Sequence, residues 1–447
     1  MTRSSRSAPP TPQIPGSALV TMAATRRSFL RSAALGGVVL GTPGLLAACG
    51  GDSGGGGGEA AAKTVKFGVN EAKGSGPAAQ RLIAMAEAYA KETGVTVEGN
   101  YVDHNTFQDA ITTYLQGTPD DVFTWFAGFR MNQFAEQGAI SDVSDLWPLD
   151  GMSDAFKTAS TASDGKQYFV PKDYYPWAVF YKKSVFEKGG YAPPANLEEL
   201  TALATKMKAD GITPFAFAAK DDWAPLGTFD VLNMRINGFQ FHMDLMAGNK
   251  EWNSSEVKNV FDAWAGLLPF HQEDSLGRTW QEAATSLGKD ETGMYLLGTF
   301  VADGIPDVVD DLDFFTFPEL DASVGATALD APIDGFCLAS GGKNQEAGKA
   351  MMKWLASAKA ADIANDNADA PMIAANSDAS TETYSALQLK SAEVVGAAEN
   401  IAQFLDRDTR SDFVPAVKTG IQAFLKAPGD IDKVLASIQE QKESIFV

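Results

Sequence analysis

The segment that ends at Cys49 constrains the fold most strongly, because it sets the first 48 residues apart from any folded domain. Arg26 and Arg27 lie in Thr-Arg-Arg-Ser-Phe-Leu-Arg, the pattern of a twin-arginine export signal, and an apolar run follows from Ala33 to Ala48. The run ends in Leu-Ala-Ala-Cys, which is typical of a lipobox. It has 16 residues and is broken by glycine and proline, whereas a membrane-spanning helix needs roughly 20 apolar residues. We therefore predict that residues 1–48 are a signal peptide and that lipid at Cys49 anchors the exported chain to the outer face of a bacterial cytoplasmic membrane.

The chain after the signal peptide is acidic and long. Residues 49–62 are glycine-rich and predict a flexible tether, and ordered sequence begins near Lys63. The removed segment carries five arginines and no acid, so the remaining 399 residues have a formal charge of −26. Such a charge repels nucleic acid and anionic lipid, so we expect no nucleic-acid partner and no membrane binding through a basic face. A length near 400 residues favours two lobes, each with its own core.

Cysteine use excludes an intramolecular disulfide. The chain has two cysteines, and lipidation of Cys49 leaves Cys337 alone. Cys337 lies in the apolar run Ile-Asp-Gly-Phe-Cys-Leu-Ala. We expect a buried, unreactive thiol there.

Strand and helix patterns alternate along the chain. Strands are expected at 63–69, 95–102, 121–126, 167–171, 178–181 and 314–317, and helices at 77–93, 196–209, 254–268 and 344–358. This order predicts an α/β protein with mostly parallel sheets. No long linker divides the chain, which favours lobes built from interleaved segments with several crossings between them.

Catalytic and metal-binding motifs are poorly supported. The three histidines, His104, His242 and His271, do not stand at metal-ligand spacing, and no Gly-x-Ser-x-Gly or phosphate-binding glycine loop occurs. The acidic run 310–313 lacks the loop pattern of a known calcium site, so a solvated turn is the better interpretation. We expect no catalytic residue, no metal and no cofactor. Counting carboxylates does not exclude a glycosidase pair.

Aromatic residues beside polar groups are the chemical signal that remains. Trp125 ends a predicted strand, Trp177 follows an Asp-Tyr-Tyr-Pro run between two strands, and Trp223 follows Asp222. Aromatic faces stack on the C–H side of a pyranose, while carboxylates, amides and arginines bind its hydroxyl groups. For these three tryptophans a ligand role and a core role stay equally open. Trp264 and Trp354, on predicted helix faces, are expected in the core.

Several segments together resemble the family 1 extracellular solute-binding proteins, the carbohydrate-binding lipoproteins of bacterial ABC importers. The segments that carry the resemblance are 118–128, 135–138, 144–147, 170–177, 181–182, 211–216, 293–295 and 298–300, with Pro318 and Pro332. The resemblance implies a periplasmic-binding-protein-like fold of two α/β lobes with a ligand cleft between them. It places 63–172 and about 301–340 in the first lobe, and 173–300 and about 341–447 in the second.

The resemblance also implies a function and a site. The protein would capture a mono- or oligosaccharide by hinge closure and deliver it to the transmembrane permease subunits of an ABC transporter. We expect a monomer without enzymatic activity. The expected ligand-binding residues are Glu71, Trp125, Phe126, Asp173, Tyr174, Trp177, Trp223, Trp280, Phe300, Asp334 and Arg407, with Tyr175 and Pro176 inside the matched segment Asp173–Trp177.

Two alternatives stay open. Adjacent Tyr174 and Tyr175 invite ferric-ion capture, because paired tyrosines are phenolate ligands in iron-binding relatives. An exported glycoside hydrolase would need two carboxylates roughly 5–10 Å apart across a bound sugar. The adjoining Pro176-Trp177 and the many aromatic residues favour the sugar receptor.

Overall fold

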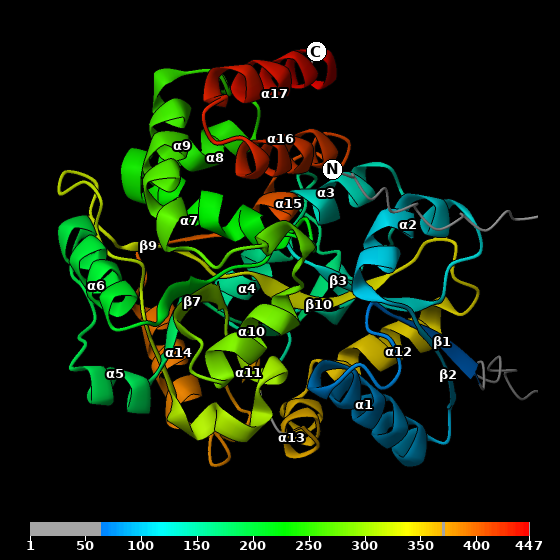
Figure 1. Cartoon of the computed structure of the whole chain (residues 1–447). Coiled ribbons are helices and arrows are strands. Elements are labelled where there is room, and N and C mark those ends of the chain that lie inside the picture. The colour runs from blue at the N-terminus through cyan, green and yellow to red at the C-terminus, as the bar shows by residue number, and fades with distance from the viewer. Residues whose placement is uncertain (1–63, 369–371, 447) are drawn as a thin grey trace, which may run out of the picture. The chain divides into compact units, whose positions relative to one another are not determined.

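The structure is a computed structural model that describes residues 64–368 and 372–446. The predicted signal peptide (1–48), the lipidated Cys49 and the tether (49–62) lie outside the described residues. The described chain forms two main sheets, each with its own helices, and one two-stranded ribbon (Figure 1).

The first sheet has six strands in the order β11-β4-β10-β3-β1-β2. Their bounds are β1 Thr64–Val69, β2 Thr96–Tyr101, β3 Val122–Phe126, β4 Phe169–Tyr174, β10 Ile333–Leu338 and β11 Ile373–Ala374. One face packs on α1 Pro77–Thr93, α12 Gln345–Leu355 and α13 Ala358–Asp366. The other face packs on α2 His104–Gln116, α3 Phe129–Glu136 and α4 Asp154–Ala159.

The second sheet has four strands in the order β6-β7-β5-β8. They are β5 Trp177–Lys182, β6 Thr213–Ala216, β7 Thr292–Gly298 and β8 Leu312–Phe315. The helices outside the first lobe are α5 Lys183–Gly189, α6 Leu197–Ala209, α7 Ala224–Asn237, α8 Phe239–Met246, α9 Ser255–Leu267, α10 Trp280–Gly288, α11 Val301–Gly304, α14 Ala386–Ala397, α15 Leu405–Asp408, α16 Val414–Lys426 and α17 Ile431–Ile445. Strands β9 Ala328–Asp330 and β12 Asn400–Ala402 form the ribbon, and short 3-10 turns lie at Ser144–Leu146, Leu268–Phe270, Ser275–Gly277 and Pro306–Asp311.

Local sequence signals account for the helix ends. Pro77 occupies the first turn of α1, where its missing N–H is not needed, and Gly94 ends the helix at φ 72°, in the left-handed region that glycine adopts without strain. Asn196 caps α6, because its side chain accepts a hydrogen bond from the backbone N–H of Glu199 at 2.9 Å. The predicted helix 344–358 is interrupted, since Ser357 caps the separate helix α13.

The α/β prediction is confirmed, but the sheets are mixed rather than mostly parallel. Among the described strands of the two main sheets, β1–β2, β1–β3 and β6–β7 are parallel. Strands β10 and β4 run antiparallel to their neighbours in the first sheet, as β5 does in the second. Strand β10 joins the first sheet after a long segment of the chain that belongs to the other lobe. The local sequence pattern therefore does not indicate the direction of this strand.

The predicted lobe boundaries are wrong in two places. The chain leaves the first sheet between β4 and β5, close to the predicted change at residue 173. Strand β8, within the segment 301–340 placed in the first lobe, pairs with β5 in the second sheet. Helices α12 and α13, from the segment placed in the second lobe, pack on the first sheet. Each error has the same cause. Which of the two lobes an amphipathic segment packs against depends on contacts with residues far away in the sequence, and these leave no local pattern.

Candidate ligand-binding site

A cavity of about 180 Å³ is lined by elements of both lobes. Its first-lobe wall follows the end of β1, where Glu71 lies, and includes Asp173 near the end of β4 and Asp334 at the start of the antiparallel strand β10. Its second-lobe wall includes Trp177 at the start of β5 and Trp280 at the start of α10, and α15 also contributes. Ligands of open α/β sheets bind at the carboxyl ends of strands, so the cavity has the position expected of a ligand site.

Adjacent strands bring two acidic residues together on the first-lobe wall. Asp173 on β4 and Asp334 on β10 are direct partners in the antiparallel register. Burial raises the pKa of the Asp173 carboxyl, the ion pair with the Lys172 ammonium opposes that rise, and the Asp334 charge adds to it. The pair therefore places two acceptors of hydrogen bonds side by side.

Arg407 on α15 joins this wall to the connection between the lobes. Its Nη1 donates to Asp334 Oδ1 at 2.8 Å and its Nη2 donates to the hydroxyl of Tyr175 at 3.1 Å. The guanidinium also stacks on Phe126, with Cζ 3.9 Å from the ring centroid. These contacts hold Asp334 and Tyr175 in fixed orientations, so Arg407 organises the site and its charge is already engaged.

A buried ion pair crosses from one lobe to the other. Arg81 on α1 donates to Asp303 on α11, with Nη2 and Oδ2 3.0 Å apart, and the two side chains are 6% and 9% exposed. Asn105 on α2 makes a second such contact, from its Nδ2 to Asp221 Oδ1 at 3.3 Å. Both contacts exist only while the lobes are in this arrangement.

Aromatic side chains cover the second-lobe wall. Phe300 lies edge-on to Tyr175, Trp177 and Trp280, with ring centroids 5.4, 6.2 and 5.3 Å apart. Trp177 stacks on Phe404 at 4.8 Å. Trp223 lies 6.0 Å from Phe300. Such mutual packing holds the rings rigidly and leaves an apolar surface opposite the acidic one.

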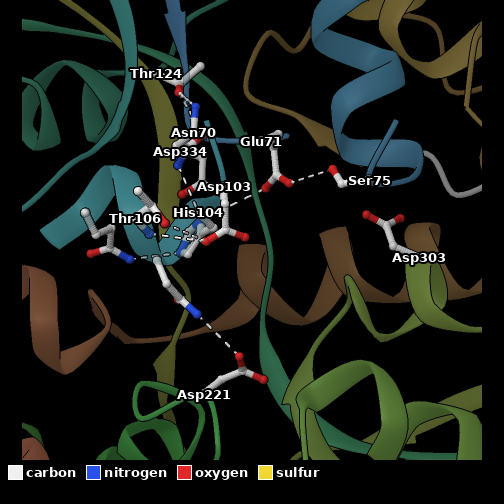
Figure 2. A network of polar contacts seen from close by, with 12 residues as sticks. Asn70, Glu71, Ser75, Asp103, His104, Thr106, Thr124, Asp221, Asp303 and Asp334 are labelled. Atoms are coloured by element: carbon white, nitrogen blue, oxygen red, sulfur yellow. Dashed lines mark hydrogen bonds and ion pairs between the residues drawn. The ribbon is translucent and has the colours of Figure 1, made fainter. Parts of the chain in front are cut away.

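Glu71 and His104 belong to a hydrogen-bonded network on the polar wall. Figure 2 shows Glu71 between Ser75, whose hydroxyl donates to Oε2 at 3.3 Å, and His104, whose Nδ1 lies 4.0 Å from Oε1. His104 also contacts the side-chain amides of Asn70 and Gln108, at 3.5 and 2.9 Å. Burial, then the charge of Asp303, raises the pKa of Glu71 to about 7.

The imidazole of His104 is uncharged at neutral pH. Its pKa is lowered to about 4, mainly by burial and then by the charge of Arg407. His104 therefore adds hydrogen-bonding capacity to the polar wall and no positive charge.

Eight of the eleven predicted ligand-binding residues line the cavity. They are Glu71, Asp173, Trp177, Trp223, Trp280, Phe300, Asp334 and Arg407. Trp125, Phe126 and Tyr174 are not among its lining residues. Trp125 is 1% exposed and packs against Phe126 and Phe134, so its core role is the one that the structure has.

The other two lie near the cavity without lining it. Phe126 is 2% exposed and supports Arg407. Tyr174 points to the opposite side of its strand from Asp173 and packs against Phe156, with ring centroids 5.4 Å apart. Tyr175 does line the cavity, so the two adjacent phenols do not face one site, and the ferric ligand pair of the alternative hypothesis is not formed.

Sequence reasoning missed other residues of the cavity, among them Arg81, Asp103, His104, Asp303 and Asp406. Arg81 directly precedes Leu82 in α1, and its burial is evident only in the structure. A buried charged residue needs a partner. Asp303 and Asp406 are in short helical turns without any distinctive pattern.

Further sequence expectations concern groups outside the cavity. Within 64–368 and 372–446, no cluster of three or more His, Cys, Asp or Glu residues could hold a metal ion. Cys337 is fully buried, and burial raises the pKa of its thiol. Trp264 is fully buried as expected, while Trp354 is partly buried and donates to Glu92. No helix in the described part of the chain is long and apolar enough to cross a membrane.

Comparisons with known proteins agree with this architecture. Residues 73–362 match the profile of the bacterial extracellular solute-binding protein family. An uncharacterised ABC transporter extracellular-binding protein of Pyrococcus horikoshii is 23% identical over 339 residues, which are 73% of this chain and 72% of that protein.

Solved structures extend the similarity. The bacterial solute receptor AcbH, described as having an exclusive preference for β-D-galactopyranose, is 40% identical, with a TM-score of 0.83 over 86% of this chain and 99% of that one. A chitin oligosaccharide binding protein is 19% identical, with a TM-score of 0.75 over 84% and 98% of the two chains, and shows the shared fold. With the matched profile covering well over half of its length, the chain belongs to the bacterial extracellular solute-binding protein family.

Proposed function

We propose that this protein is the sugar-binding receptor of an ABC importer. The observation that carries the proposal is the pairing of two unlike walls around one cavity. One wall is aromatic, with Trp177, Trp223, Trp280 and Phe300, and the other presents carboxylates such as Asp173. A pyranose has the same two-sided chemistry, since its C–H face stacks on aromatic rings and its hydroxyl groups bond to charged and amide groups.

The proposed ligand is a single pyranose. The cavity of about 180 Å³ is below the roughly 300–1,000 Å³ that is usual for larger organic ligands. Of the range from mono- to oligosaccharide that the sequence left open, the size of the cavity supports the lower end. The 40% identical receptor is described as a galactopyranose receptor, which supports the same choice.

Closure would couple binding to transport. The ligand would contact both lobes only when they are together, so it would shift the population toward the closed form. The closed form would then dock on the permease as a monomer. Export by the twin-arginine route and a lipid at Cys49 would keep the receptor at the outer face of the cytoplasmic membrane. We propose binding and release without chemical change, so the carboxylates would act as hydrogen-bond acceptors.

Calorimetry with neutral monosaccharides tests the proposal. The purified protein is titrated with D-galactose, D-glucose, D-mannose and D-xylose, and its thermal unfolding is measured with the same sugars. A sugar at 100 times its Kd should add about 2.7 kcal/mol to the free energy of unfolding. Trp223→Ala should weaken binding, while Trp354→Phe, which changes a partly buried ring of α12 that does not line the cavity, should not. Absence of any sugar response, or release of a hydrolysed product, would refute the proposal.

A further inference from the structure

The cavity carries more acidic than basic side chains. Three basic residues line it, and each has a carboxylate of the same cavity within 4.0 Å: Arg81 with Asp303, Lys172 with Asp173, and Arg407 with Asp334. Four further acidic residues line it without a lysine or arginine at that distance among the described residues. They are Glu71, Asp103, Asp221 and Asp406. The cavity therefore has an excess of negative charge.

Two of these four carboxylates have structural roles. Asp103 caps α2, since it accepts from the backbone N–H of Thr106 at 3.2 Å. Asp221 accepts from the backbone N–H of Trp280 at 2.8 Å and from Asn105 of the other lobe. Their charges are thus held at the rim of the site by the fold itself.

Glu71 and Asp406 do not have a structural role like that of Asp103 or Asp221. The hydrogen bond that Glu71 accepts comes from the Ser75 hydroxyl, and its nearest ionisable partner is the uncharged His104. Asp406 is 2% exposed and accepts no hydrogen bond from the described part of the chain, yet its carboxylate oxygens are not sealed from the cavity. Asp406 therefore meets an incoming ligand with its acceptor capacity unused, and Glu71 with most of its capacity unused.

A ligand that carries its own negative charge would meet two obstacles here. Its charge would lie beside Asp406 and, above about pH 7 where the Glu71 carboxyl is ionised, beside Glu71 as well. The aromatic wall of the site lowers the local dielectric constant, which strengthens like-charge repulsion. Each cation that could attract it is already paired. Recruiting Arg81, for example, would leave Asp303 buried without its partner, and this is strongly unfavourable.

We infer that the site is a charge filter, which admits neutral sugars and rejects sugar acids and sugar phosphates, with Glu71 and Asp406 as the residues that determine this specificity. The inference rests on the proposed sugar-binding function. It adds selection by the charge of the ligand to selection by its shape.

Calorimetry with ligands that differ only in charge tests the filter. The probes are D-galactose and D-glucose, their C6 uronates, and the corresponding uronamides, which are neutral and nearly the same shape as the uronates. For the sugar that binds, the uronate should be at least about 100-fold weaker than the uronamide, since each tenfold step corresponds to about 1.4 kcal/mol and like charges cost several times that. Because Asp406 is 2% exposed and the Glu71 side chain is 27% exposed, most of the discrimination should persist at 0.5 M salt, an ionic strength at which surface effects are screened over roughly 4 Å.

Two variants and a matched control identify the residues. At pH 8, above the pKa of about 7 that Glu71 has, Glu71→Gln and Asp406→Asn each remove one charge and keep the shape. Each should raise the uronate-to-uronamide affinity ratio at least about tenfold. Asp145→Asn removes an equal charge from a side chain that is 61% exposed and lies outside the cavity, so it should leave the ratio unchanged.

Each contrary result has a distinct meaning. A uronate that binds the wild-type protein within about tenfold of its uronamide overturns the filter while sugar binding stands. A uronamide as weak as the uronate assigns the rejection to shape and also overturns it. Unchanged ratios in both variants overturn the roles of Glu71 and Asp406. If none of the neutral sugars binds, the proposed function fails and this inference falls with it.

Discussion

Replacing Gly227 with alanine should displace Trp177, a residue that lines the proposed sugar site. Gly227 lies inside α7, against the ring of Trp177, and a Cβ at this position would be 2.3 Å from Trp177 Cζ3 and 2.4 Å from Cε3. The ring is 2% exposed and stacked on Phe404, so it cannot yield as a flexible side chain would. Either the stack must break or α7 must move away from β5.

The expected magnitude follows from two opposing terms. Overpacking a filled core costs about 1–3 kcal/mol, and alanine gains about 0.5–1 kcal/mol over glycine inside a helix. Because the clash is with ring carbons and far inside contact distance, we expect a net loss of about 1–2 kcal/mol in the free energy of unfolding. A displaced Trp177 should also raise the Kd for sugar at least about tenfold, which corresponds to about 1.4 kcal/mol.

Gly266→Ala is the matched control, because Gly266 lies in helix α9 and a Cβ added there would have no other atom within 4 Å among its described surroundings. This variant should be more stable by about 0.5–1 kcal/mol and bind sugar normally. The difference between the two variants in urea denaturation then measures the clash alone, because the helix-propensity terms cancel. Equal stability of the two variants, together with an unchanged Kd in Gly227→Ala, would refute the reasoning.

Three other outcomes are expected. Arg81→Met should cost about 3–5 kcal/mol of stability in urea denaturation, because it leaves Asp303 buried and unpaired, and a double variant with Asp303→Leu should recover most of the loss; full additivity would contradict this. The raised pKa of Glu71, about 7, means that the folded state holds its proton more tightly than the unfolded state does, so its contribution to stability is complete below about pH 4.5 and is lost as the pH rises through 7. Glu71→Gln should remove that slope, worth at most about 3 kcal/mol, and a wild-type slope in the variant would contradict the assignment. Cys337 should react with a thiol reagent only after unfolding, and rapid labelling of the native protein would show that its strand opens.

Local patterns predicted the elements well, because hydrophobic period and capping act within a few residues. The helix at 77–93 has the predicted bounds, with Pro77 and Gly94 at its ends. The strand expected at 121–126 is β3, Val122–Phe126. What these patterns left open was where each element packs, as β8 and α12 show by lying in the lobes opposite to those predicted.

The site divides in the same way. Aromatic and acidic residues near strand ends were visible in the chain, and most of them line the cavity. This signal did not distinguish Trp125 and Phe126 from the residues that line the cavity. Whether a ring at a strand end faces a ligand or the core depends on the helices packed against it, and Trp125 is packed against α3.

By itself, the sequence determined the alternation of strands and helices, the acidic charge, the single cysteine in the folded region and the supply of aromatic side chains, because each of these is a property of composition or of short-range periodicity. Only the tertiary structure decided the mixed direction of the sheets, the pairing of Arg81 with Asp303 and the charges left unpaired around the cavity. Residues 81 and 303 are on different lobes, and burial and pairing depend on distances that arise only when both lobes have folded. The specificity of such a site is therefore determined by long-range contacts, while the types of side chain available to it are determined by the local sequence.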